Sequence, residues 1–291
     1  MSRTAIAPRR RKSIVLTLMM CLFLVYTLVP IVWLFINATK TQDARLNSFG
    51  LWFSGKFSLW QNIHDTFAYA DGQFGRWLLN TLLYVVIGAG CGTLLATLAG
   101  YGLARFDFPG KRVFFPMLLG AVAIPATALA VPTFLMFSKL GMTNTPWAVI
   151  IPSLINPFGL YLVWYFADDA LPAEVLAAAR IDGAGEFRIF RSIALRLLMP
   201  GLVPVLLFSF VTAWNNYFLP LIMLSDTKWF PITVGLNNWS MQNQQAVTAS
   251  GHPIDNIILT GSLLSIIPTI VVFLVLQRYW EAGLVSGSVK E

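Results

Sequence analysis

The chain has 291 residues, of which 57% are hydrophobic and 11% charged. An average soluble domain is roughly 25% charged, and a water-soluble fold of this length would leave aggregation-prone apolar patches on its surface. The net charge of +7 comes from cations at the ends of apolar segments. They form no basic stripe, which argues against nucleic acid as a partner. Composition therefore predicts a protein for which lipid is part of the solvent.

Six stretches without Asp, Glu, Lys, Arg or His are long enough to cross a bilayer, which takes about 20 mostly apolar residues. They cover residues 13–39, 77–104, 113–137, 147–167, 201–225 and 256–277. None alternates polar and apolar residues as lipid-facing strands do. The first follows the basic residues 1–12 but is too long for a signal peptide and ends in no small-residue cleavage site. The expected fold is an all-α integral membrane protein with six transmembrane helices.

The Lys and Arg residues predict the orientation of these spans. With the N-terminus in the cytoplasm, fourteen of them fall on inner segments and six on outer segments. Because basic residues concentrate in cytoplasmic loops, both termini are expected inside. A transmembrane domain over 13–277 then has one long inner loop, 168–200, and an inner tail, 278–291. Two long outer segments, 40–76 and 226–255, are rich in Trp, Asn and Gln.

Several function classes are disfavoured by what the spans lack. An ion-coupled transporter usually keeps an ionisable residue within the membrane, and none of the six stretches has one. His64 and His252 fall in outer segments, and Cys21 and Cys91 lie in apolar runs, so no metal site or disulfide is expected. No GxxxxGK[ST] phosphate loop occurs. The chain is therefore expected to be no enzyme, and to take energy for uphill transport from another subunit.

Prolines interrupt the predicted spans, and each removes one backbone hydrogen bond. They are Pro125, Pro132, Pro152, Pro157, Pro204 and Pro268. Ordinary kinks between packed helices account for any one of them, whereas the paired breaks in the third and fourth spans favour a gated path lined by water.

The residue pattern of the inner loop predicts two helices joined by a tight turn. Pro172 suits the first turn of a helix, and Gly183 can adopt the left-handed conformation that ends it. A second, amphipathic helix is expected from about Glu186. The apolar positions of this helix are Phe187, Phe190, Ile193 and Leu197, and its basic positions are Arg188 and Arg191. Pro200 is expected to open the fifth span. The pattern fits an interfacial helix anchored on lipid phosphates or a docking element for a cytoplasmic partner.

This loop resembles the cytoplasmic signature of binding-protein-dependent ABC permeases: Glu-Ala-Ala, three residues, Gly, nine residues, then Ile-x-Leu-Pro. The matching positions are Ala178, Ala179, Gly183, Ile193 and Leu195. The run from Arg180 through Asp182 to Ala184 is similar to the carbohydrate-uptake branch and its smaller maltose permease subunits. Two positions depart from the signature: Ala177 replaces the Glu, with Glu174 one turn earlier, and Arg196 replaces the Pro.

The resemblance extends over nearly the whole chain. Segments similar to the family are residues 138–145, 157–159, 214–217 with Pro220, 277–279 and 283–290. It implies the type I importer permease fold in a bacterial or archaeal cytoplasmic membrane. The implied partners are a second permease completing a heterodimeric pore, two ATP-binding subunits, an extracytoplasmic solute-binding protein and membrane lipid.

The resemblance also implies roles for particular segments. The inner loop would insert into a cleft of the ATPase subunit, and tail residues Gly283, Gly287 and Lys290 would reach between the ATPase subunits. ATP and Mg²⁺ would bind there, and this chain would hold no cofactor. Transport would proceed by alternating access.

A pore without charge suits a neutral, hydroxyl-rich cargo such as a saccharide. Candidate groups along its path are Asn156, Trp214, Asn215, Asn216 and Tyr217, although Trp and Tyr also anchor helices at the membrane interface. Other interpretations are a permease for glycerol-phosphate, a secondary transporter or channel for a small neutral solute, and a membrane scaffold.

Overall fold

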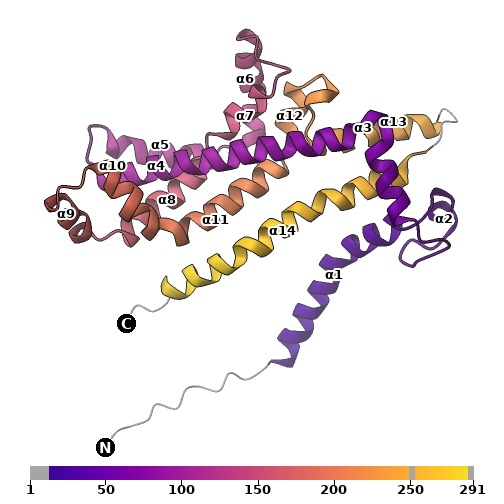
Figure 1. Cartoon of the computed structure of the whole chain (residues 1–291), viewed down its shortest axis with the longest axis horizontal. Helices are drawn as coiled ribbons and strands as arrows, with labels where there is room; N and C mark the ends of the chain where they lie inside the picture. The colour runs from indigo at the N-terminus through magenta and orange to yellow at the C-terminus, as the bar shows by residue number, and fades with distance from the viewer. Residues whose placement is uncertain (1–12, 249–252, 288–291) are drawn as a thin grey trace, which may run out of the picture.

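The computed structural model describes residues 13–248 and 253–287, and this part of the chain is helical with no strand (Figure 1). Five helices are long and apolar enough to cross a membrane, and a sixth span results if one bent pair of helices is counted together. The expectations for residues 1–12, His252 and Lys290 lie outside the described residues. The chain is thus an all-α multi-pass membrane protein.

The helices of the first part of the chain are, in order, α1 Ile14–Ala38, α2 Gln42–Asn47, α3 Leu59–Val85, the π-helix η1 Val86–Cys91, α4 Gly92–Arg105, α5 Lys111–Ala123, α6 Ala126–Lys139, α7 Trp147–Ser153 and α8 Pro157–Ala170. They are followed by α9 Ala173–Ile181, α10 Glu186–Ile189, the π-helix η2 Phe190–Ala194, α11 Leu195–Trp214, α12 Phe218–Met223, the 3-10 helix η3 Thr227–Trp229, α13 Ile232–Thr248 and α14 Asp255–Gly287.

The helix of the second span begins earlier than the apolar stretch. α3 starts at Leu59 and turns sharply where Ala70, Asp71 and Gly72 take positive φ values of 51°, 55° and 77°. Before this turn α3 runs across the direction of the spans; after it, α3, η1 and α4 form one long helix that ends at Arg105 (Figure 1).

The third and fourth predicted spans are each interrupted at a proline. α5 and α6 are bent by 100° at a break ending at Pro125. Ile124 is extended there (φ −78°, ψ 123°), because the ring of a following proline disfavours helical backbone. α7 and α8 are separated before Pro157, and Asn156 caps α8 by accepting a hydrogen bond from the Gly159 amide at 2.8 Å. The third span is therefore sharply bent, whereas the fourth is interrupted between α7 and α8 but still qualifies as one span over 147–170.

The expectation that Pro200 opens the fifth span is wrong. α10, η2 and α11 form one continuous helix from Glu186 to Trp214, with Pro200 and Pro204 inside it. A proline removes one hydrogen bond, but in lipid the helix is still the only local way to satisfy the other backbone groups. The inner loop is therefore joined to the fifth span without a hinge, and α11 ends before the short helix α12.

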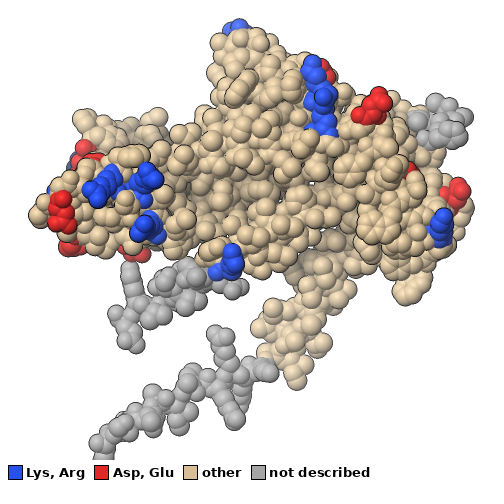
Figure 2. Space-filling view, in the orientation of Figure 1, with Lys and Arg blue, Asp and Glu red and all other residues tan. Residues whose placement is uncertain are grey.

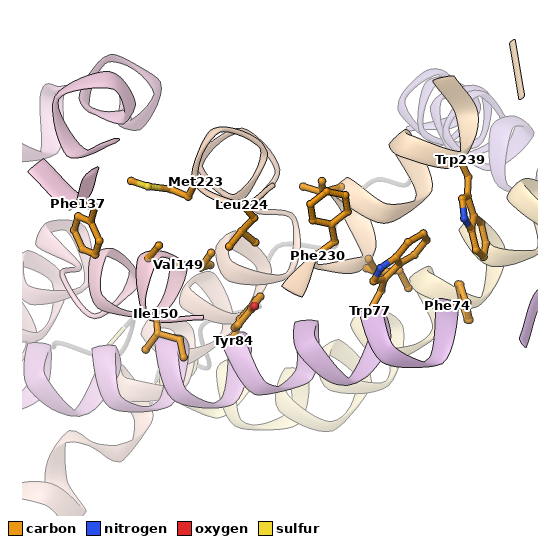
Figure 3. Packing of buried hydrophobic residues seen from close by; sticks show 13 residues of the cluster. Phe74, Trp77, Tyr84, Phe137, Val149, Ile150, Met223, Leu224, Phe230 and Trp239 are labelled. Carbon is orange, nitrogen blue, oxygen red and sulfur yellow. The ribbon is translucent and has the colours of Figure 1, made fainter. Parts of the chain in front are cut away.

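The largest apolar core is built from the second half of α3, the end of α6, the start of α7, the end of α12 and the first turns of α13 (Figure 3). The rings of Trp77 and Trp239 are 4.6 Å apart, and the Trp77 indole donates to the Thr227 carbonyl at 2.8 Å. Tyr84 donates to the Trp229 carbonyl at 2.7 Å. This core fixes the segment after α12 against α3.

Charged side chains gather at the two ends of the molecule. On the face in Figure 2, Lys and Arg cluster over the end with α9 and α10, and most of the surface between the ends carries no charge. Between these ends α4 packs closely on α8, since a Cβ on Gly100 would lie 2.8 Å from Val163. The uncharged middle is the part suited to the hydrocarbon layer.

Candidate coupling loop and transport path

A glycine turn joins the two helices of the inner loop. α9 ends at Ile181 with Asp182 as its C-cap, and Gly183 follows with a φ of +79°. The Ala184 amide donates to the Ala179 carbonyl, and the Gly183 amide to the Arg180 carbonyl, both at 3.0 Å. This pair of bonds is the Schellman arrangement, which needs a left-handed residue at the position of Gly183. The glycine turn predicted from the sequence is therefore present.

A small apolar cluster holds α9 against α10. Leu176, Ala179 and Ile189 are buried in it, and Ala184 and Ile193 pack at its edge. Leu195 packs on a second cluster that includes Leu171 and Phe190 and reaches α4. Of the signature positions, Ala179 is thus buried, and Ile193 and Leu195 are half-buried against these clusters.

The other predicted loop positions face outward. Glu174, Ala177, Ala178 and Asp182 are exposed. Two large apolar side chains of the loop, Ile181 and Phe187, are also exposed. Exposed apolar groups beside polar ones are typical of surfaces that bind another protein. Because Ala177 and Arg196 are both exposed, the two departures from the signature change this outer surface and leave the loop's interior as it is.

Two polar contacts fix the position of the loop. Arg180 donates to Glu186 at 2.6 Å across the glycine turn. On α4, Arg105 donates to the carbonyls of Ala167 at 2.5 Å and Asp168 at 3.3 Å. Carbonyls in the last turn of a helix lack intrahelical donors, so Arg105 ties the end of α8 to α4. Sequence reasoning missed both contacts, since an arginine at the end of a span has no signature.

Three of the five predicted path residues line one cavity. Its volume is about 540 Å³, and its walls come from the end of α11, the start of α13 and the middle of α14. The polar residues of its lining are Asn215, Tyr217, Thr233, Asn237, Ser265 and Thr269, beside Trp214 and apolar side chains. Every group in it is neutral, so it can offer hydrogen bonds but no counter-ion.

Trp214 and Tyr217 lie differently in this cavity. Trp214 is almost completely buried, stacks on Phe210 at 5.6 Å, and donates its indole N–H to the Ser265 carbonyl at 3.1 Å. The Tyr217 hydroxyl accepts a hydrogen bond from Asn237 at 2.8 Å and keeps its own proton for donation. Trp214 therefore connects α11 to α14, whereas the Tyr217–Asn237 pair presents polar groups to the cavity.

The remaining two path residues lie outside this lining. The Asn216 carbonyl accepts from the Thr233 hydroxyl at 2.8 Å. Asn156 caps α8 and donates to Ser209 on α11 at 2.8 Å, which joins two helices. Sequence reasoning missed the other polar residues of the lining: Thr233 and Asn237 come from a polar segment treated as an outer loop, and Ser265 and Thr269 from the sixth predicted span.

At the end of the chain, Gly283 and Gly287 belong to the last turns of α14. The predicted tail thus continues the last helix as far as the described residues reach. Among the described residues, no group of His, Cys, Asp and Glu side chains could hold a metal ion.

Comparison with known proteins identifies the family. The family described as "Binding-protein-dependent transport system inner membrane component" matches residues 92–285, which include the loop and the cavity. The chain belongs to this family. The permease is 34% identical over 229 residues to the arabinooligosaccharides transport system permease protein AraQ of Halalkalibacterium halodurans, covering 78% of this chain and 79% of that protein.

Two further relatives cover more of the permease. The diacetylchitobiose uptake system permease protein NgcG of Streptomyces coelicolor is 28% identical, over 100% of this chain and 92% of that protein. The trehalose transport system permease protein SugB of Mycobacterium tuberculosis is 30% identical, over 91% of this chain and 93% of that protein.

The fold of the permease is also found in a solved structure. A bacterial ABC transporter involved in the import of the acidic polysaccharide alginate has a chain that matches with a TM-score of 0.81 and 22% identity, covering 94% of this chain and 100% of that chain. This likeness shows that the permease has the fold of an ABC importer subunit.

Proposed function

We propose that this permease forms half of the pore of an ATP-driven importer of neutral saccharides. The observation that carries the proposal is the family's signature loop, which folds as an exposed helix, a glycine turn and a second helix continuous with a transmembrane span. Such an element can pass movement of a bound partner directly to the pore. The names of three relatives include an oligosaccharide or a disaccharide, which supports saccharides as the substrate class.

The partners follow from the same proposal. A second permease completes the pore, and two ATP-binding subunits dock on the loop 168–200 and near the end of α14. ATP and Mg²⁺ bind in those subunits and not in this chain. An extracytoplasmic solute-binding protein delivers the sugar, which the family's description as binding-protein-dependent supports. The complex lies in the cytoplasmic membrane of a bacterium or archaeon, with both termini of this chain inside.

The neutral cavity supports a saccharide over a charged solute. Its amide and hydroxyl groups, with the Tyr217–Asn237 pair among them, can exchange hydrogen bonds with sugar hydroxyls. A phosphate-bearing solute would instead require basic side chains, which compensate a charge taken out of water. The lining residues offer none.

The first test is to purify the permease from its native membrane in mild detergent. Recovery of an ATPase subunit and a second permease in one complex is expected. A secondary transporter or channel would be recovered without an ATPase and would show uptake that does not depend on ATP in proteoliposomes. Either of these two results would overturn the importer proposal. If the complex with an ATPase subunit is recovered, uptake of labelled saccharides by the reconstituted complex would identify the substrate.

A further inference from the structure

The segment 46–60, from the end of α2 to the start of α3, exposes an unusual number of large apolar side chains. Trp52 is 71% exposed and Trp60 76% exposed. The exposed aromatic residues of this segment are Phe49, Trp52, Phe53, Phe57 and Trp60. Its one charged residue is a cation, Lys56. A patch of this kind in water would favour aggregation.

The polar side chains around the same segment point inward. Lys40 is 0% exposed and donates to the Ser48 hydroxyl at 3.0 Å and the Phe49 carbonyl at 2.8 Å. Asn37 is buried and donates to the Gly50 carbonyl at 2.8 Å. Polar groups inside and aromatic groups outside reverse the arrangement of a loop in water. The backbone of the segment is fixed by these bonds, so the aromatic side chains face outward in an ordered structure.

The patch is continuous with the surface of α1. Phe35, near the end of α1, is exposed and its ring meets the ring of Phe53 edge-on at 6.4 Å. Exposed apolar side chains follow α1 from Ile14 onward, as expected for a transmembrane helix that faces lipid. The aromatic segment begins just beyond the end of this helix, at the depth where Trp side chains prefer to lie.

The first turns of α3 have two exposed faces of different character. Trp60 and Phe67 lie on one face and are exposed. Gln61 and Asp65 lie about 100° and 140° around the helix from Trp60 and share a hydrogen bond of 2.7 Å. This part of α3 runs across the spans rather than along them (Figure 1). A helix in this orientation can place one face in lipid and the other in water.

We propose that residues 46–60 and the first turns of α3 form a membrane-interface anchor, with their aromatic side chains in the lipid headgroup layer at the end of the molecule opposite α9. The anchor holds the end of α1 and the start of α3 at a fixed depth. Its partner is the lipid surface, and Lys56 adds attraction to lipid phosphates.

The anchor can be tested with nitroxide spin labels on the permease in lipid nanodiscs. Single cysteines replace Trp52, Trp60 or the control Gln61 in a background with Cys21→Ala and Cys91→Ala. Labels at 52 and 60 should be more accessible to oxygen than to a water-soluble nickel chelate, and the label at 61 should show the reverse. Equal accessibility at 60 and 61 would overturn the proposal.

A second measurement keeps the native aromatic residues. Brominated phosphatidylcholine should quench the tryptophan emission of the permease, and Trp52→Phe or Trp60→Phe should remove part of the quenched signal. Loss of the oxygen accessibility of labels 52 and 60 on adding the solute-binding protein or the second permease would instead assign the patch to that protein. Both measurements are independent of uptake, so they separate this proposal from the proposed function.

Discussion

At the end of the permease with α2, buried and half-buried polar side chains of α2, α3, α13 and α14 meet in one network of hydrogen bonds, which includes a carbonyl at the end of α1. At the end with α9, the loop is held by the exposed Arg180–Glu186 pair and a small apolar cluster. Asn62 shows the contrast, since it donates to two carbonyls and accepts from Asn256 at 3.1 Å. A network of this kind resists local opening, whereas a few exposed contacts permit it. The end that is proposed to move with a partner is therefore the less constrained one.

The largest expected effect is on uptake, from Gly183→Val at the glycine turn. A β-branched residue at a φ of +79° is strained by about 1–2 kcal/mol or more, so the loop will leave the geometry that docks. Uptake should fall by about tenfold or more, because one such shift changes an equilibrium by that factor per 1.4 kcal/mol. Uptake by membrane vesicles measures it, with the amount of inserted permease as reference.

Gly185→Ala is the matched control for that variant. Gly185 has a φ of −70° and open space where a Cβ would be, so alanine should leave uptake unchanged. If Gly183→Val also transports normally, the loop has no coupling role that depends on this turn.

The next largest effect is on stability, from Asn62→Ala at the opposite end. The carbonyls of Ala38 and Lys40, which accept from Asn62 at 2.8 Å and 2.9 Å, would lose a donor in a buried site. An unsatisfied buried polar group costs about 1–3 kcal/mol, so the midpoint of thermal unfolding in detergent should fall. Gln61→Ala, on the exposed face of the same helix, should leave it unchanged. A similar midpoint for both variants would show that the network adds little.

A smaller loss of stability is expected from Asp255→Asn. Asp255 accepts from Arg45 at 2.5 Å, Gln42 at 3.2 Å and Asn243 at 3.0 Å. Asparagine keeps one acceptor oxygen but not the charge. The Arg45 and Asp255 side chains are 19% and 30% exposed, so water compensates part of the roughly 1.5–3 kcal/mol that a hydrogen bond to a charged group contributes. Unfolding in SDS at fixed ionic strength measures the loss, with Asp43→Asn on the exposed side of α2 as control.

The smallest effect is expected from Glu186→Gln in the inner loop. The Arg180 and Glu186 side chains are 44% and 45% exposed, and water and salt screen such pairs strongly. The unfolding midpoint should not change measurably. A loss as large as that of Asp255→Asn would contradict the difference between the two ends.

The sequence predicts the spans well because their signal is local. Hydropathy and charge locate all six apolar stretches, and Pro125 and Pro157 mark breaks that the structure contains. The interpretation of a proline as a boundary of a helix is wrong at Pro200, where the helix continues. Hydropathy also misses the start of α3, because the first residues of this helix are too polar to be recognised as part of a span. A proline shows where a backbone bond is missing, but the surrounding helices decide whether the chain turns there.

The site is only partly predictable for a different reason. The turn at Gly183 depends on adjacent residues, so a motif reveals it. The Tyr217–Asn237 pair joins residues twenty positions apart and the Arg45–Asp255 pair residues 210 positions apart. Such contacts depend on how helices are placed relative to one another, which periodicity does not encode.

The π-helix η2 corrects the phase between the loop and the span. Ile189 and Leu198 are both buried, yet nine residues of regular α-helix, at about 100° each, would put them on opposite sides. A π turn takes up one extra residue, which leaves the equivalent of eight and an offset of about 80°. The cluster under α9 and the buried stripe of α11 therefore lie about 80° apart instead of on opposite sides of the helix. Deletion of one residue in η2 would leave a regular α-helix with this same offset, whereas insertion of one more residue would turn one of the two by about 100° toward solvent or lipid.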